Sequence, residues 1–326
     1  MWVKITIIFL LVFQVNVPLF SQEKAAAIDK SDKVLYTLKS NFPVNVQNVY
    51  EYTDTSKITR TFSDSTVQKF TRILKYYFSL WAPSSPTSEN QLSVLCSVDS
   101  LEYTLIGRDT TIFFNSQADD LRPPKHEDYQ ILMCPLGLEF EMIYSPYRDV
   151  AYLTGDNYKE KLYLLNDSTK SPSDSLIKFT WLDRFSKIPL LTYFDIVKGI
   201  YPAGKVFIDS TWQKGITMDV EGTSVVDSIN FTLKSFNIKN FIIEGKSSNV
   251  SILSGDSARL FNIRTLANPQ SVSGTSSYKI KLQPKGTLDE LFINSDYTIN
   301  YNVFRDIVIQ KIVSSKSWKL VGMFKI

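Results

Sequence analysis

The sequence predicts a mainly β protein of the α+β class, in which a large antiparallel curved sheet or half-barrel carries two amphipathic helices packed on it. Three observations support this prediction. Apolar and polar residues alternate over many segments, as in half-buried strands. Aromatic residues make up 13% of the chain, and their rings suit pleated surfaces better than helical bundles. Most alternating segments follow one another without an intervening helix, so neighbouring strands are expected to run antiparallel.

The N-terminus has the layout of a secretory signal peptide. Lys4 precedes an almost unbroken apolar run from Ile5 to Val17, and the small residue Ser21 follows. A run of about 13 apolar residues is too short to cross a bilayer as a helix, which needs about 20. We therefore expect residues 1–21 to be removed and residues 22–326 to form a single exported β-rich domain, periplasmic or extracellular.

Residues 34–165 are predicted to form the first β half of this domain. The segment 66–81 fits both helical and strand spacing, but its aromatic content and the turn cluster before it favour the return strand of a hairpin. The sequence SPYRD at 145–149 contains a proline between two alternating runs, and it is interpreted as the corner of a hairpin rather than a reactive loop. Further strands are expected in the segments 34–38, 48–62, 91–105, 110–116, 138–145 and 150–154.

The period changes between residues 174 and 199, where two amphipathic helices are predicted. The first has an apolar stripe, and the second begins at Pro189 and ends at Gly199. Extended segments return in the second β half, 201–326, and they include separate strands at 307–313 and 317–326. The helices need an apolar partner for their stripes, and a sheet face is the natural one. The stripe of the first helix consists of Ile177, Trp181, Phe185 and Ile188.

Several chemistries lack the residues they need. The formal net charge is only +3 and the cations form no block, which argues against a nucleic-acid surface. His126 is the one histidine, so a Ser-His-Asp or Cys-His arrangement would have to use it, and the GDSA sequence at 255–258 has no histidine after it. One histidine and two cysteines fall short of a zinc site. No calcium-loop, nucleotide or dinucleotide motif is present.

Paired carboxylates are the remaining route to catalysis. Glu139 with Glu141, or Asp119 with Asp120, would suit a glycosidase, which needs two carboxyl groups about 5 to 10 Å apart. A solvated strand face explains such pairs more simply. We therefore expect no enzyme activity, no catalytic residues, no cofactor and no metal site.

The two cysteines, Cys96 and Cys134, both lie in alternating runs. In an oxidising compartment they can form a disulfide, which would stabilise the fold by roughly 4 kcal/mol in the chain-entropy model. Alternatively they remain buried thiols that behave as small hydrophobic side chains. The sequence leaves both alternatives open.

Four short motifs make the chain resemble uncharacterised exported proteins of Bacteroidota and related bacteria. They are the Tyr-rich VYEYTDTSKI, the hairpin YSPYRDVAYLTG, the late QPKGTLDELFI, and a P-x-x-x-V-x-x-D-x-x-W element formed by Pro202, Val206, Asp209 and Trp212. Those proteins are distantly similar to the lipoprotein carriers LolA and LolB. The resemblance implies an antiparallel half-barrel that helices close over an apolar cavity.

Together these observations predict a non-enzymatic exported binding protein for a lipid or another hydrophobic ligand, with peripheral association with the outer membrane or cell envelope. The alternative is a structural or adhesive cell-surface protein that uses the loops 82–90 and 116–128 as contact sites. A carboxylate-dependent glycosidase is less favoured. So is an outer-membrane β-barrel, which is suggested by the alternation of Trp318, Leu320, Phe324 and Ile326.

Overall fold

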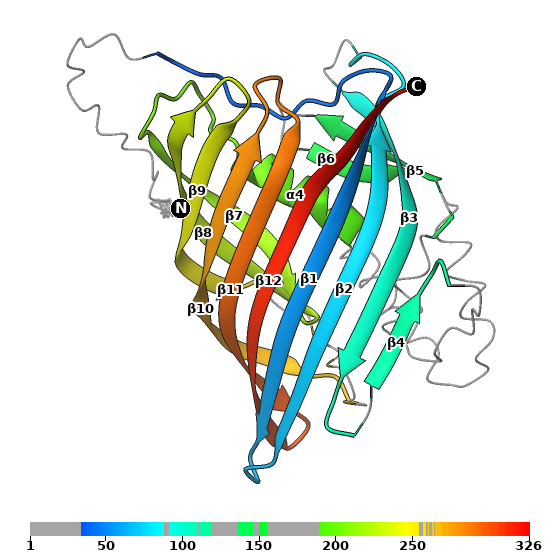
Figure 1. The fold of residues 1–326 in the computed structure, drawn as a ribbon. Helices are drawn as coiled ribbons and strands as arrows, with labels where there is room; N and C mark the ends of the chain where they lie inside the picture. Colours follow the sequence, from blue (N-terminus) through cyan, green and yellow to red (C-terminus); the bar gives the residue numbers. More distant parts are fainter. Residues whose placement is uncertain are drawn as a thin grey trace, which may run out of the picture. The chain divides into compact units, whose positions relative to one another are not determined.

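The computed structural model shows one large antiparallel sheet (Figure 1). It contains 12 strands, with the order β6-β5-β3-β2-β1-β12-β11-β10-β9-β8-β7 and with β4 paired to β3. The predicted mainly β class and antiparallel sheet are therefore confirmed. The structure describes residues 34–87, 91–109, 111–118, 136–137, 139–145, 150–154, 189–253, 257–258, 260, 263 and 265–326.

The strands are long, and most of them pair by hydrogen bonds with the strand that precedes or follows them in the sequence. The first strands run β1 Val46–Phe62, β2 Val67–Trp81, β3 Leu92–Ile106, β4 Thr111–Asn115, β5 Glu139–Ser145 and β6 Val150–Thr154. After the helix α4 Pro189–Ile200 come β7 Thr211–Val220, β8 Thr223–Phe236, β9 Phe241–Ile252, β10 Asn268–Leu282, β11 Leu288–Val303 and β12 Asp306–Lys325.

Two strand predictions at difficult positions are confirmed. The segment 66–81 forms β2, which pairs along its length with β1, so its aromatic residues follow strand parity rather than helical spacing. The strands β5 and β6 pair antiparallel from Ser145 and Val150, so the segment between them connects a hairpin. The corner residues 146–149 themselves lie outside the described residues.

Two other predictions need correction. Residues 34–38 form no strand; Tyr36 makes only an isolated bridge with Val206, because this segment crosses the end of the sheet instead of joining it. The segments 307–313 and 317–326 are not separate strands but one continuous strand, β12. Ser314 and Ser315 interrupt the apolar alternation without interrupting the ladders to β1 and β11, because small hydroxyl side chains fit either face of a strand.

One helix, α4, is seen among the described residues. It begins at Pro189, as predicted, and ends at Ile200, one residue beyond the predicted Gly199. The indole Nε1 of Trp212 donates to the carbonyl of Ile200 at 2.8 Å, which satisfies an end carbonyl of the helix. The first predicted helix lies outside the described residues, so a pair of helices is not confirmed. No helical stretch in the described part combines the length and hydropathy needed to span a membrane.

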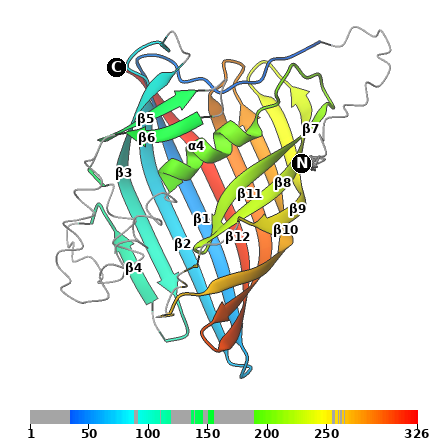
Figure 2. The same cartoon turned by 180° about the vertical axis from the view of Figure 1, so that it is seen from behind.

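The sheet is open and curved, and α4 lies against its concave side (Figure 2). The helix contacts β6 and β7, the two edge strands, which requires the sheet to curl toward itself. Tyr193 of α4 reaches the middle strands, where its ring lies 5.1 Å from that of Tyr50 and 5.9 Å from that of Phe78. The apolar face of the sheet is therefore the concave one, and the helix completes its core.

The segment 34–45 closes one end of the sheet. The ring of Tyr36 packs against those of Phe236 and Phe241, with a centroid distance of 5.2 Å to each, at the turn between β8 and β9. Farther along, the amide of Asn41 donates to the carbonyl of Gly286 at 3.0 Å. Gly286 has φ +95°, and a Cβ there would lie 2.4 Å from the carbonyl oxygen of Lys39, so only glycine permits this close approach.

Candidate functional site

A row of serines crosses the concave face of the sheet. The strand registers place Ser56 of β1 opposite Ser314 of β12, Ser314 opposite Ser295 of β11, and Ser295 opposite Ser276 of β10. Ser56 also pairs with Arg72 of β2, which extends the row by one strand. We call Ser56, Ser314, Ser295 and Ser276 the serine belt. Because directly opposed residues share a face, the belt forms a line of short polar side chains within an otherwise apolar surface.

The hairpin of β7 and β8 lies over this belt. Its two turn residues, Glu221 and Gly222, have φ +52° and +86°, as in the type I′ turn that suits a two-residue hairpin. On the hairpin, the Thr223 hydroxyl lies 2.7 Å from that of Tyr301 in β11. The Nζ of Lys316 in β12 donates to the carbonyl of Asp219 at 3.5 Å. The short serine side chains leave room for the hairpin to approach the sheet.

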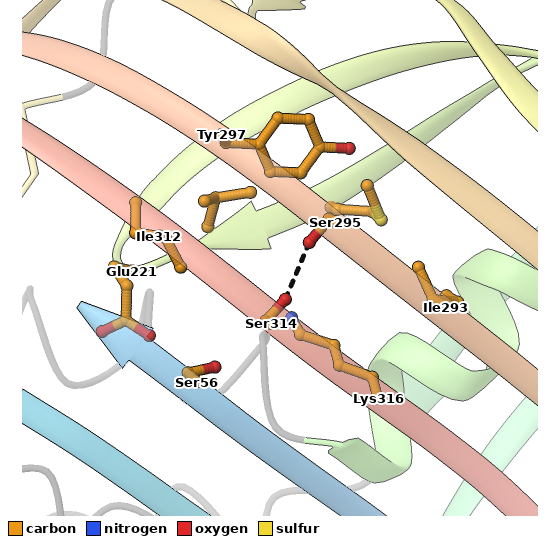
Figure 3. Close-up of a pocket in the computed structure, with 10 residues that line it drawn as sticks. Ser56, Glu221, Ile293, Ser295, Tyr297, Ile312, Ser314 and Lys316 are labelled. Carbon is orange, nitrogen blue, oxygen red and sulfur yellow. Dashed lines mark hydrogen bonds between the residues drawn. The ribbon is translucent and has the colours of Figure 1, made fainter. Parts of the chain in front are cut away.

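A small pocket remains between the hairpin and the belt (Figure 3). Its free volume is about 10 Å³, which suffices for about one water molecule. Within it the hydroxyls of Ser295 and Ser314 lie 2.7 Å apart, and the Ser56 hydroxyl donates to Asp54 at 2.6 Å. The pocket is lined by Ser56, Met218, Val220, Glu221, Ile293, Ser295, Tyr297, Ile312, Ser314 and Lys316.

An ion-pair cluster fixes the hairpin tip to the sheet. The Arg72 guanidinium lies 2.6 Å from a carboxylate oxygen of Glu221 and 3.3 Å from one of Asp54. The two carboxylates are nearly inaccessible, with side-chain exposures of 9% and 4%, whereas Arg72 keeps 23%. Burial raises the pKa of the neighbouring Tyr52 well above its usual range, and the negative charge of Asp54 adds to this effect. Arg72 therefore links β2 to a turn that is 149 residues distant in sequence.

A second buried carboxylate stands at the other end of the belt. Asp227 of β8 accepts hydroxyl hydrogen bonds from Ser276 at 2.5 Å, Tyr297 at 2.6 Å and Ser247 at 2.5 Å. Burial raises the pKa of Tyr297, and the hydrogen bond that it donates to Asp227 raises it further, so this phenol stays protonated. The hydrogen bonds stabilise the carboxylate and attach β8 to β9, β10 and β11.

An apolar row borders the belt on one side, where Ile58, Ile312 and Tyr297 stand opposite one another in register. On the side nearer α4, the next row carries two charged residues, since Lys316 stands between Asp54 and Ile293. Beyond that row Trp318 lies between Tyr52 and Leu291, and its ring centroid is 4.6 Å from that of Tyr52. The buried indole Nε1 of Trp318 has no hydrogen-bond partner among the described residues. The concave face thus combines a polar line with flanking aliphatic and aromatic surface.

The structure places some of the sequence-predicted site residues. Glu139 and Glu141 share one face of β5, and Glu141 accepts a hydrogen bond from the Ser93 hydroxyl at 2.6 Å. Asp119, Asp120 and His126 lie outside the described residues. In the described part, no three His, Cys, Asp or Glu side chains are grouped so as to bind a metal ion.

Cys96 is a buried free thiol on β3, and burial raises its pKa well above the usual range, with a smaller contribution from the charge of Glu139. Cys134 lies outside the described residues. The pairing of the two cysteines therefore stays a prediction.

The P-x-x-x-V-x-x-D-x-x-W element connects α4 to β7. Asp209 has φ +68°, and its amide donates to the carbonyl of Leu233 at 2.7 Å. Val206 pairs with Tyr36, and Trp212 holds the end of α4. These contacts give the motif a structural role in positioning the helix and the hairpin.

The serine belt and the Arg72 cluster were missed at the level of sequence. Serines count as breaks in an alternating pattern, and only the strand register shows that they line up. A two-residue turn at Glu221 and Gly222, flanked by the alternation of Ile216, Met218 and Val220, was the available signal for the hairpin. Its contact with Arg72 is a tertiary feature that no local pattern encodes.

The fold and the site define a protein built from one large open antiparallel sheet with an apolar concave face and a buried polar line. No protein-family model matches the sequence, and no curated protein matches it. A lipovitellin structure has a TM-score of 0.44 at 12% identity, and the match covers 87% of this chain and 26% of that chain. The chain thus spans about a quarter of the lipovitellin chain.

Two bacterial structures show weaker similarity. An outer membrane channel from Pseudomonas putida F1 has a TM-score of 0.23 at 8% identity, with 91% of this chain and 100% of that chain covered. OpdQ from Pseudomonas aeruginosa has a TM-score of 0.20 at 7% identity, with 85% and 98% covered. These TM-scores and that of lipovitellin lie below 0.5, and the function proposed below rests on the residues of this chain alone.

Proposed function

We propose that this protein is an exported, non-catalytic binding protein whose concave sheet face takes a hydrophobic or amphipathic ligand of the lipid class. The observation that carries the proposal is the serine belt within the apolar concave face, covered by a hairpin that an ion-pair cluster fastens. Hydrocarbon suits the apolar rows, and a polar headgroup suits the belt with its neighbours Lys316 and Arg72.

The side chains of the belt support binding rather than catalysis. The Ser56 hydroxyl donates to Asp54, a carboxylate that is also paired with Arg72, and the hydroxyls of Ser295 and Ser314 bond to each other, so all three hydroxyls have hydrogen-bond partners within the fold. The buried Nε1 of Trp318 is a hydrogen-bond donor beside the apolar rows that a carbonyl or phosphate oxygen of a ligand would satisfy.

Ligand entry requires the hairpin to move. A free volume of about 10 Å³ is far below the roughly 300 Å³ or more of a typical small-molecule site. Since β7 is the edge strand, the hairpin has a strand neighbour on the β8 side alone. Displacing its tip would break the Arg72–Glu221 ion pair and expose the belt. In this proposal, binding of a ligand therefore displaces the hairpin tip.

An acyl-chain probe tests the proposal directly. We expect the exported protein to bind cis-parinaric acid with saturable fluorescence enhancement, and Glu221→Gln to accelerate the uptake because the hairpin tip is released. Glu51→Gln is the matched control: it removes a similar ion pair, with Lys75 at 3.3 Å, on the convex face. Its uptake rate should equal that of the unchanged protein.

Two results would defeat the proposal. One is the absence of saturable probe binding in a folded protein that also carries no lipid after organic extraction. The other is uptake that Glu221→Gln and Glu51→Gln accelerate equally. N-terminal sequencing tests the export separately, since a signal peptide removed after Ser21 leaves Gln22 as the first residue.

A further inference from the structure

One end of the sheet gathers loops from distant parts of the chain. Along this end runs the segment 34–45, drawn in blue at the top of Figure 1. It contacts the loop 201–210 through the bridge of Tyr36 with Val206, and the loop 283–287 through the hydrogen bond of Asn41 to Gly286. It ends beside the C-terminal residue, where the amide of Ile326 donates to the carbonyl of Asn45 at 3.0 Å.

These loops are basic. The described charged residues in 34–45, 201–210, 237–240, 283–287 and 325–326 are one aspartate, Asp209, and the lysines Lys39, Lys205, Lys239, Lys285 and Lys325. All five lysines are exposed, and none forms an ion pair within the described part of the chain. We call these loops and their five lysines the lysine rim.

The opposite end of the sheet differs in charge. Its hairpin loops 63–66, 107–109 and 304–305 carry two arginines, Arg108 and Arg305, and two aspartates, Asp64 and Asp109, among the described residues. The charges there balance, although Phe304 is as exposed as the apolar residues of the rim, at 84%. The excess of positive charge is therefore a property of one end and not of the whole surface.

The lysine rim also exposes apolar side chains. Ile238 is 93% exposed at the tip of the β8–β9 turn. That turn is well fixed, since the Asn237 side chain accepts hydrogen bonds from the amides of Lys239 at 2.9 Å and Asn240 at 2.7 Å. The other exposed apolar residues of the rim are Val34, Leu35, Val44 and Ile326, and Phe324 is exposed beside it in β12.

We propose that the lysine rim docks on the surface of a bilayer that contains anionic phospholipid. Lysines beside exposed apolar side chains match the interface of such a bilayer, where the phosphates attract the ammonium groups and the apolar residues enter the acyl boundary. A fixed turn lowers the entropic cost of inserting Ile238. The inference is independent of ligand binding on the concave face, because it uses a different surface.

Vesicle flotation with the exported full-length protein tests this docking. We expect binding to phosphatidylcholine vesicles with 30% phosphatidylglycerol, little binding to pure phosphatidylcholine, and loss of binding at high salt, where surface charges are screened. The triple variant Lys205→Glu, Lys239→Glu, Lys285→Glu should bind roughly 100-fold more weakly, from the contribution that each lysine makes near an anionic surface. Ile238→Ser should weaken binding roughly 10-fold through lost apolar burial.

The opposite end supplies matched controls. Arg108→Glu with Arg305→Glu, and separately Phe304→Ser, should leave binding unchanged within twofold. Circular dichroism checks that each variant folds, and Lys239→Gln with Ile238→Ser replaces the triple variant if that fails. Docking at the rim is overturned by absent binding to anionic vesicles, by equal binding to neutral vesicles, or by control variants that weaken binding as much as the rim variants.

Discussion

The Arg72 cluster offers the sharpest test of how the hairpin is held. Replacing Arg72 with methionine keeps much of its apolar stem but removes the charge that lies between Asp54 and Glu221. Two nearly inaccessible carboxylates then stand near each other without that guanidinium. Removing one partner of a buried ion pair typically costs about 3 to 5 kcal/mol, because the other charge stays buried.

The expected magnitude is smaller than that range because water can approach the cluster. Arg72 is 23% exposed, and Asp54 keeps its hydrogen bond from Ser56 at 2.6 Å. We therefore expect Arg72→Met to lower the free energy of unfolding by about 2 to 4 kcal/mol. Glu221→Gln leaves the pair of Arg72 with Asp54, so it should cost about 1 to 2 kcal/mol. The double variant should cost less than the sum, with a coupling of about 1 kcal/mol or more.

Urea unfolding, followed by circular dichroism and tryptophan fluorescence, measures these differences. The matched control is Lys75→Met with Glu51→Gln on the convex face, where the side chains are 34% and 27% exposed. That exposed pair should contribute no more than about 1 kcal/mol. The reasoning is refuted if Arg72→Met costs less than about 0.5 kcal/mol, or if the two ion pairs show equal coupling energies.

Three further predictions concern the core. The free energy of unfolding should fall steeply as pH rises above 10.0, the ordinary tyrosine pKa, because five buried tyrosines have raised pKa values in the folded protein: Tyr50, Tyr52, Tyr278, Tyr297 and Tyr301. Above pH 10.0 these phenols lose their protons in the unfolded chain but keep them in the folded one, and each contributes up to about 1.4 kcal/mol per pH unit. Urea unfolding across pH 9 to 12 measures this change, and a free energy of unfolding that stays constant over that range contradicts the prediction. Gly245→Ala should cost about 1 to 3 kcal/mol in the same assay, since its Cβ would lie 2.6 Å from the Phe231 ring, whereas Gly204→Ala, with open space around it, is the control. With reductant present, Cys96 should resist iodoacetamide at pH 8 until urea is added, as mass spectrometry of the labelled peptides would show; rapid labelling of the folded protein would contradict its burial and raised pKa.

The local features of the sheet were predictable from sequence. In much of β2 and in part of β1, apolar residues recur every second position, and the structure buries these residues on the concave face. Pro189 marked the start of α4 because its fixed φ and missing amide suit the first turn. These features depend on the chain within a few residues, so a single sequence carries them.

The site could not be predicted in the same way. Ser56 and Ser314 are 258 positions apart in the chain, yet they face each other because β1 pairs with β12. In this pairing the first strand, β1, lies beside the last strand, β12, and no residue pattern near either serine predicts that the two strands pair. Arg72 and Glu221 meet for a similar reason, since the curvature of the sheet brings the edge hairpin over β2. Register and curvature are global properties, and they decide which polar residues come together.

The strand register fixes the serine belt within the apolar face, whereas the β7–β8 hairpin above the belt is held by separate contacts. The ladder between β11 and β12 runs from Glu290 to Asp306 without a bulge, so Ser295 and Ser314 stay opposed as long as the sheet exists. A slip of one residue would turn both serines and every neighbouring apolar side chain to the convex face, which burial of those apolar groups strongly opposes. The hairpin, by contrast, is fastened over the belt by the Arg72 ion pairs and a few hydrogen bonds from its own side chains and backbone. Breaking those contacts leaves the ladder intact. In the proposed function, the belt is therefore the part of the site that keeps its geometry, and the hairpin is the part that is displaced when a ligand binds.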